Sequence, residues 1–213
     1  MAPLDLMQDI LIYALPLLFA ITVHEAAHAY AAKYFGDATA FMVGRMTLNP
    51  LKHIDPIGTI LIPLISLFVG GFLFGWAKPV PVNFSALRNP RVDAFWVAAA
   101  GPLANFAMAI AWAIVLKLDV LSAHNYFSMP LGLMSEGGVA INLSLMVLNL
   151  LPILPLDGGR MLMSLLPRDL ANAYSRIEPY GIWILLALLY LNVLTPLLWP
   201  IIKALRALIQ VFV

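Results

Sequence analysis

Two histidines and a glutamate lie within five residues of one another near the start of the chain. His24, Glu25 and His28 form an H-E-x-x-H pattern. On a helix, residues four apart lie on one face about one turn apart, so both imidazoles can reach one metal ion. Glu25 then stands beside a metal-bound water. This is the chemistry of a zinc hydrolase, in which the carboxylate takes a proton from that water.

A purely structural role for these three residues is the weaker interpretation. In that role they would pair with one another between packed helices. The pattern uses two of the four histidines of the chain and lies in an apolar stretch. Ionisable side chains are costly inside a membrane segment and indicate a functional site by default.

A catalytic zinc ion has three protein ligands and an open position for water. Among the candidate third ligands, only Asp157 lies inside a long apolar segment. Pro152 and Pro155 interrupt the helical ladder before it, and two glycines after it allow close backbone approach, so a broken helix presents the carboxylate. The alternative is an aspartate that only binds free backbone amides at Gly158 and Gly159.

The composition predicts a polytopic membrane protein. The 213 residues are 62% apolar and 11% charged, with a mean hydropathy of +0.92, whereas a soluble domain has about a quarter charged residues. Twelve basic and eleven acidic residues give a net charge of +1, which leaves no basic surface for nucleic acid. The chain has no cysteine, so disulfides, thiolate metal sites and a cysteine nucleophile are excluded.

Several apolar segments are near or above the roughly 20 residues that span a bilayer core. They cover residues 7–35, 57–76, 94–118, 138–166 and 179–213. We therefore expect an all-α membrane protein with about four to six membrane segments in a single domain over 1–213. Its core would cover about 7–166, with accessory helices at 177–213, where Pro196 and Pro200 divide the tail into a span and a returning or surface helix.

The first apolar segment is expected to be a retained membrane helix. Residues 1–32 contain no Lys or Arg, and Asp5 and Asp9 stand where a signal peptide carries positive charge. Lys33 in the last turn and Gly36 after it predict the end of the helix at Gly36.

Two segments are predicted to be non-helical. Residues 38–49 mix β-branched and aromatic residues around Gly44, which predicts a small β-hairpin or edge strand. Residues 77–92 contain three prolines and an Asn-Pro step, which predict an extended loop.

These patterns resemble the site-2 protease family of intramembrane zinc metalloproteases. The likeness rests on H-E-x-x-H and on N-x-x-P-x-x-P-L-D-G-G, and covers residues 20–160. It extends through Arg45-x-Thr47-x-Asn49-Pro50-x-x-His53-x-Asp55-Pro56, Gly75-Trp-Ala-Lys-Pro-Val-Pro-Val-Asn83 and Ala100-Gly101-Pro102-x-x-Asn105. The chain is similar to the compact bacterial and archaeal members, which lack an inserted PDZ domain.

The resemblance implies a function and a role for each motif residue. His24, His28 and Asp157 would bind one Zn²⁺ per chain, and Glu25 would be the catalytic acid and base. Asn149 would hold the substrate or stabilise the oxyanion. The protein would be a zinc metalloendopeptidase in the lipid bilayer of a prokaryotic cell membrane, and its partners would be transmembrane protein substrates rather than nucleic acid.

Three asparagines in apolar segments are further candidates. Asn142 and Asn149 are seven residues apart, hence on one helix face, and would line the cavity beside Asp157. Hydrogen bonding to a neighbouring helix is the rival role, because such amides commonly link membrane helices. Asn105 has the same two interpretations.

The shared ion also constrains the topology. His24 is about 18 residues into the first apolar segment and Asp157 about 20 into the fourth. These depths agree only if both segments run in the same direction, which predicts that segment 57–76 re-enters through Gly70-Gly71. Nine of the twelve basic residues then lie on the face after the first helix. The positive-inside rule places that face, and the active site near it, in the cytoplasm.

Other functions remain open for the same residues. A divalent-metal transporter would pass an ion through His24, His28 and Asp157, but it does not need Glu25. A non-catalytic family member acting as a membrane chaperone is the second alternative, although every motif residue is present. A different membrane zincin would use a glutamate in place of Asp157.

Overall fold

The computed structural model describes residues 6–62, 65, 75–121 and 128–212. This part of the chain is mostly helical and contains no strand. The elements in chain order are α1 (Leu6–Tyr34), α2 (Thr39–Met42), η1 (Pro50–Lys52), η2 (Pro56–Leu61), η3 (Phe84–Ala86), α4 (Pro90–Leu121), α5 (Ser128–Asn149), α6 (Asp157–Leu165), α7 (Arg168–Ser175), η4 (Glu178–Tyr180), α8 (Gly181–Tyr190) and α9 (Leu194–Phe212).

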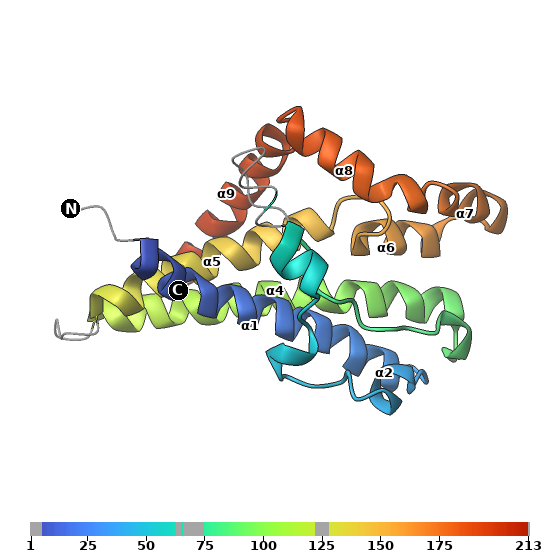
Figure 1. Cartoon of the computed structure of the whole chain (residues 1–213), viewed down its shortest axis with the longest axis horizontal. Helices are drawn as coiled ribbons and strands as arrows, with labels where there is room; N and C mark the ends of the chain where they lie inside the picture. The colour runs from blue at the N-terminus through green and yellow to red at the C-terminus, as the bar shows by residue number, and fades with distance from the viewer. Residues whose placement is uncertain (1–5, 63–64, 66–74, 122–127, 213) are drawn as a thin grey trace.

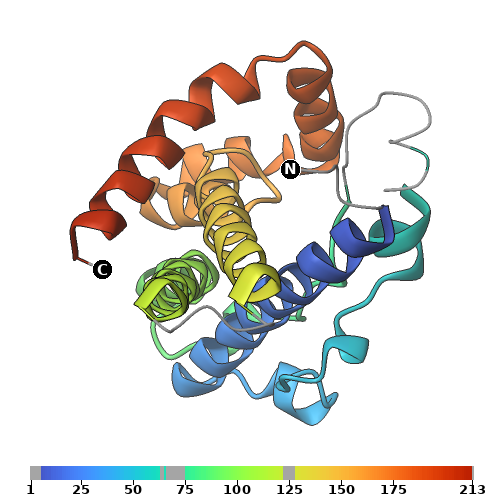
Figure 2. The same ribbon diagram turned by 90° about the vertical axis from the view of Figure 1, so that its left-hand side faces the viewer.

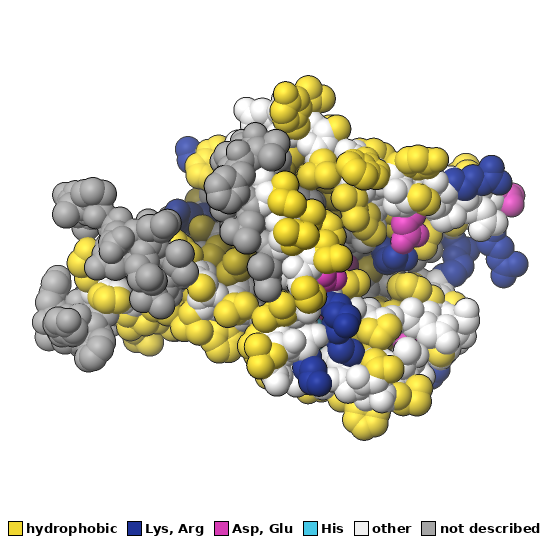
Figure 3. All heavy atoms as spheres, in the orientation of Figure 1, with side chains coloured by type: hydrophobic (Ala, Val, Ile, Leu, Met, Phe, Trp, Pro, Cys, Tyr) yellow, Lys and Arg dark blue, Asp and Glu magenta, His cyan; other side chains and the backbone are white. Residues whose placement is uncertain are grey.

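Within the described ranges, four helices are long and apolar enough to cross a membrane. They are Ile12–Tyr34, Pro90–Leu118, Met129–Asn149 and Leu194–Val211. Apolar side chains cover much of the face of the molecule in Figure 3. Lipid is the solvent that such a surface requires, because contiguous apolar patches of this extent are rare on soluble monomers. Four helices agree with the lower end of the predicted four to six.

Helices α1, α4 and α5 form the centre of the molecule. Helix α4 packs against α1, α5 and α6, while α5 also packs against α1 and α9. Helices α1 and α5 run in the same direction and α4 runs in the opposite one (Figure 1). Figure 2 shows α5 between α1, α4 and an arc formed by α8 and α9. Asp157, which follows α5, can therefore reach the same depth as the histidines of α1.

Helix α1 ends where the sequence predicts. Its last residue is Tyr34, and Gly36 has a φ of +115°, a conformation that glycine adopts without strain. The start of α4 lies at the same end of the bundle, because the N–H of Arg88 donates to the carbonyl of Phe35 at 2.9 Å. The chain from 36 to 89 therefore leaves and returns at one end.

The predicted re-entrant segment 57–76 belongs to this connection. Its two described ends meet, because the N–H of Trp76 donates to the carbonyl of Gly58 at 2.9 Å. A segment that crossed the membrane once would separate these ends by the thickness of the bilayer. The expected turn at Gly70-Gly71 lies outside the described residues, so re-entry stays a proposal.

The predicted β-hairpin over 38–49 is wrong. Residues Thr39–Met42 form the short helix α2, and bends follow it. The Asp37 carboxylate accepts hydrogen bonds from the N–H and the hydroxyl of Thr39, which favours a turn just before the helix. The β-propensity of a segment depends on a neighbouring strand, and the described part of the chain offers none.

The predicted proline-rich loop is found, but the predicted break in the tail lies at other residues. Residues 75–83 have no regular secondary structure, as expected for the proline-rich loop, and η3 and the start of α4 complete the stretch to 92. The tail divides into α8 and α9 at residues 191–193, where Asn192 has a φ of +52°, and Pro196 and Pro200 lie inside α9 rather than at the break. Pro196 is tolerated there because it is the third residue of the helix, whose N–H would have no helical partner.

Asp37 connects the loop of residues 75–83 to the end of α1 by hydrogen bonds. Its side chain is 1% exposed, and it accepts hydrogen bonds from Thr39 and from the N–H of Asn83 at 2.7 Å. Burial raises the pKa of Asp37, but these hydrogen bonds outweigh burial and hold that pKa below its usual value.

We predict that Asp37→Asn lowers the free energy of unfolding at neutral pH by about 1–3 kcal/mol, because one charged acceptor is lost. Since the folded pKa is lowered, the stabilisation is present above the ordinary carboxyl pKa and is lost as the pH falls through the folded pKa. Unfolding in detergent at neutral and acidic pH measures both effects. The wild type and Asp37→Asn should converge in acid. Exposed Asp169 is the control, and an equal loss in Asp169→Asn would contradict the assignment.

Candidate metal centre

Side chains from two helices far apart in sequence meet inside the bundle. His24 and His28 come from α1, and Asp157 is the first residue of α6. The carboxylate oxygens of Asp157 lie 3.2 Å from His24 Nε2 and 3.3 Å from His28 Nε2. The two Nε2 atoms are 3.1 Å apart. The three residues predicted as metal ligands therefore form one cluster.

The cluster is compact enough to hold one metal ion. Each imidazole faces a different oxygen of Asp157, and one ligand atom from each residue can be chosen so that all three lie within 4.8 Å of one another. His24 and His28 are 8% and 9% exposed. The buried Asp157 Oδ2 lacks a hydrogen-bond donor within the described ranges. A cation would satisfy that oxygen and both facing nitrogens.

One face of α4 holds both histidines. Val97, Gly101 and Asn105 are spaced by four residues along it. His28 Nδ1 lies 2.7 Å from the Val97 carbonyl oxygen, and His24 Nδ1 lies 2.6 Å from Asn105 Oδ1. An amide or carbonyl oxygen only accepts, so each Nδ1 donates and each Nε2 keeps its lone pair for a metal. A Cβ on Gly101 would lie 2.4 Å from His28 Nε2, so only glycine leaves room there.

Two fully buried asparagines link the histidine-binding face of α4 to α5. Asn105 Nδ2 donates to Asn142 Oδ1 at 3.0 Å and to the carbonyl of Ala20 at 3.2 Å. Asn142 in turn donates to the carbonyl of Gly138 at 2.8 Å. Both amides therefore link helices, and Asn105 also orients a predicted ligand. Sequence reasoning missed this contact, for which the only signal was the position of Asn105 one turn after Gly101.

The break before α6 explains how Asp157 is presented. Helix α5 ends at Asn149, and residues 150–156 contain turns before α6 begins. A Cβ on Gly158 would lie 2.2 Å from the carbonyl oxygen of Leu150. Glycine thus lets the first turn of α6 lie against the end of α5, as the predicted broken helix requires.

The two remaining predicted residues lie outside the three-ligand cluster. Glu25 is half-buried, and its Oε2 accepts the N–H of Val80 at 2.8 Å. Asn149 Nδ2 donates to the carbonyl of Leu145 at 3.0 Å. In the described part of the chain, Asn149 makes no hydrogen bond to the three candidate ligands.

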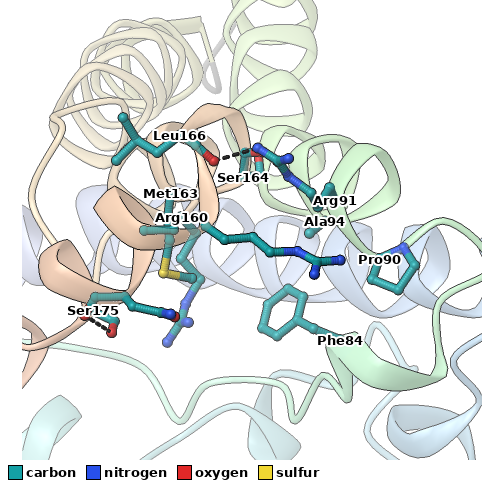
Figure 4. A pocket seen from close by; sticks show the side chains of 12 residues that line it. Phe84, Pro90, Arg91, Ala94, Arg160, Met163, Ser164, Leu166 and Ser175 are labelled. Atoms are coloured by element: carbon teal, nitrogen blue, oxygen red, sulfur yellow. Dashed lines mark hydrogen bonds between the residues drawn. The ribbon is translucent and has the colours of Figure 1, made fainter.

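A cavity of about 380 Å³ lies between α4, α6 and α7 and is lined by none of the predicted site residues. Figure 4 shows Arg91 and Arg160 beside it, together with Phe84. The guanidinium of Arg91 donates to the carbonyl of Leu166, and that of Arg160 donates to Glu178 at 2.6 Å. These contacts fasten α6 to its neighbours, so we interpret the arginines as structural.

Comparison with known proteins is consistent with this geometry. The model of peptidase family M50 matches residues 12–128 and 120–191. The "Putative zinc metalloprotease YwhC" of Bacillus subtilis is 39% identical over 208 residues, which are 95% of this chain and 89% of that protein.

Two mycobacterial relatives named "Putative zinc metalloprotease Rip2" are longer than the matched region. The protein of Mycolicibacterium smegmatis is 32% identical over 81% of this chain and 64% of its own length. The protein of Mycobacterium tuberculosis is 30% identical over 80% of this chain and 63% of its own length. No solved structure matches the chain.

We predict that Asn105→Leu lowers the affinity for Zn²⁺ by about 10–100-fold, because His24 loses the acceptor that orients its ring. Competition with a chelator measures this affinity in the purified protein. Asn142→Ala removes the next amide of the network but leaves Asn105 Oδ1 as the acceptor for His24, so it should lose less affinity than Asn105→Leu. Equal affinity in Asn105→Leu and the wild type would show that the contact does not position His24.

Proposed function

The chain belongs to peptidase family M50, the family of site-2 proteases, and we propose that it cleaves transmembrane segments of membrane proteins with one zinc ion per chain. It is an integral membrane protein with four apolar helices among its described residues. We treat residues 1–213 as one metalloprotease domain. The observation that carries the proposal is the meeting of His24, His28 and Asp157 in one cluster that is compact enough to hold a metal ion.

The proposed mechanism separates metal binding from proton transfer. His24, His28 and Asp157 would hold the zinc ion, which when bound would supply a Lewis acid for an attacking water and for the substrate carbonyl. Glu25, next to His24 in the chain, takes the proton of the attacking water and then delivers it to the leaving amine. Burial of the histidines excludes bulk water, which strengthens the electrostatic interactions inside the site.

Asn149 is proposed to bind the substrate at the end of α5. Its Nδ2 donates to Leu145, so its Oδ1 is the atom available to accept a backbone N–H of an extended substrate. Nδ2 has a second N–H, which could donate to an oxyanion while the first stays on Leu145. The contact is therefore compatible with substrate binding and with oxyanion stabilisation.

The charge distribution supports a site near the cytoplasmic face. Most Lys and Arg side chains in Figure 3 lie toward the end at which α1 ends and α4 begins. The basic residues assigned to this end are Lys33, Arg45, Lys52, Lys78, Arg88, Arg91, Arg160, Arg168 and Arg176. Cytoplasmic faces of membrane proteins carry such an excess. We therefore propose that this end faces the cytoplasm of a prokaryotic cell and that segment 57–76 re-enters from it.

We predict that Glu25→Gln keeps zinc but lowers turnover roughly 10²–10⁴-fold, the usual contribution of a general acid and base. Asp157→Asn should lose both zinc and turnover. The probe is a single-span peptide in proteoliposomes, with a fluorophore and quencher on either side of an apolar segment interrupted by Gly and Pro. Such residues unwind a helix and expose its carbonyls.

Glu136→Gln is the matched control, because Glu136 is an exposed carboxylate on α5. It should cleave at the wild-type rate. Cleavage by Glu25→Gln at the wild-type rate would remove Glu25 from the mechanism. A wild type that binds zinc without cleaving any of a panel of such peptides would favour a metal transporter or a membrane chaperone.

A further inference from the structure

An extended segment of the loop before α4 contacts the proposed general base. We call residues 77–83 the strap. The N–H of Val80, in the middle of the strap, donates to Glu25 Oε2 at 2.8 Å. The contact joins residues 55 positions apart. It occupies one of the two carboxylate oxygens of Glu25.

The strap is held in place independently of Glu25. The N–H of Lys78 donates to the carbonyl of His53 at 2.9 Å. The buried guanidinium of Arg45 donates to the carbonyl of Lys78 at 2.7 Å and lies 3.4 Å from that of Pro79. At the far end, the N–H of Asn83 donates to Asp37. Hydrogen bonds on both sides of Val80 therefore fix the position of its N–H relative to α1.

Val80 lies between two prolines, so its N–H is the one backbone donor among residues 79–81. Pro79 and Pro81 have no N–H and restrict the residues before them to extended conformations. The side chain of Val80 is buried in a cluster with Ala29 of α1 and Ala40 of α2. Ala29 lies one helical turn after Glu25, so this packing brings the adjacent N–H over the carboxylate.

We propose that Val80 is a positioning residue for Glu25. Its N–H fixes Oε2 and so sets the plane of the carboxylate, which leaves Oε1 to take the proton of the attacking water. Arg45 acts one step further away by holding the strap. The inference rests on the proposed function for its kinetic consequence, but the Val80–Glu25 contact itself can be tested without any substrate.

The kinetic test removes one N–H and little else. Val80→Pro deletes the donor within an already extended, proline-rich segment. We expect kcat to fall about 10–100-fold, the size of effect produced by small misplacements of catalytic groups. KM for the fluorescent single-span peptide and the zinc content should both stay within about twofold of the wild type.

Two variants separate the N–H from other effects. Val82→Pro is the same substitution in the same strap, at an N–H that has no hydrogen-bond partner in the described ranges, and it should keep kcat within about threefold. Val80→Ala keeps the N–H but trims the buried side chain, and it should lose less activity than Val80→Pro. A Val80→Pro enzyme with wild-type kcat overturns the proposal.

Hydrogen exchange tests the contact without catalysis. In Glu25→Ala the Val80 amide loses its acceptor, so its exchange should accelerate at least about tenfold while that of Val82 stays unchanged. Unchanged exchange at Val80 overturns the proposal, even if Val80→Pro is inactive or unstable. If the wild type cleaves no peptide, the proposed function fails while this measurement still decides whether Val80 holds Glu25.

Discussion

The cost of placing ionisable side chains among apolar helices governs this structure. Two buried imidazoles lie beside a half-buried carboxylate, and each buried polar atom that does not face the cluster must find a partner in protein. The partners come from α4, because Val97 and Asn105 accept from the two Nδ1 atoms. The packing of α1 on α4 is therefore set by hydrogen bonds as well as by apolar contact.

The antiparallel pairing of α1 and α4 follows from the same requirement. Residues four apart on α1 meet residues eight apart on α4, and Gly101 occupies the midpoint where both histidines approach the helix backbone. A larger residue there would push the rings away from Asp157. The amide chain from Asn105 to Asn142 then extends the polar network into α5, so three helices share one arrangement of hydrogen bonds, which a lipid-facing surface could not supply.

The parts of this structure that sequence predicts well are those set by local geometry. The H-E-x-x-H spacing works because helix periodicity alone aligns His24 and His28. The break before Asp157 was predictable from two prolines, and the end of α1 from Gly36. The hairpin over 38–49 failed because strand formation needs a partner that no local pattern reveals. The contacts of Asn105 and Val80 join residues 81 and 55 positions apart, so only the tertiary structure shows them.

A loop, rather than a helix, is the element suited to hold Glu25. Glu25 is rotated about 100° around α1 from His24, so it does not face α4, which contacts the two candidate histidine ligands. A helix packed on that side would have its backbone N–H groups bonded to carbonyls of its own preceding turn. An irregular strap can donate a single N–H to a side chain. Inside a membrane such backbone is tolerated only where protein or a wet cavity covers it, and that is also where a hydrolase needs its water. The same requirement accounts for the packing of helix α4 against the two histidines and for the extended segment that contacts Glu25, the proposed general base.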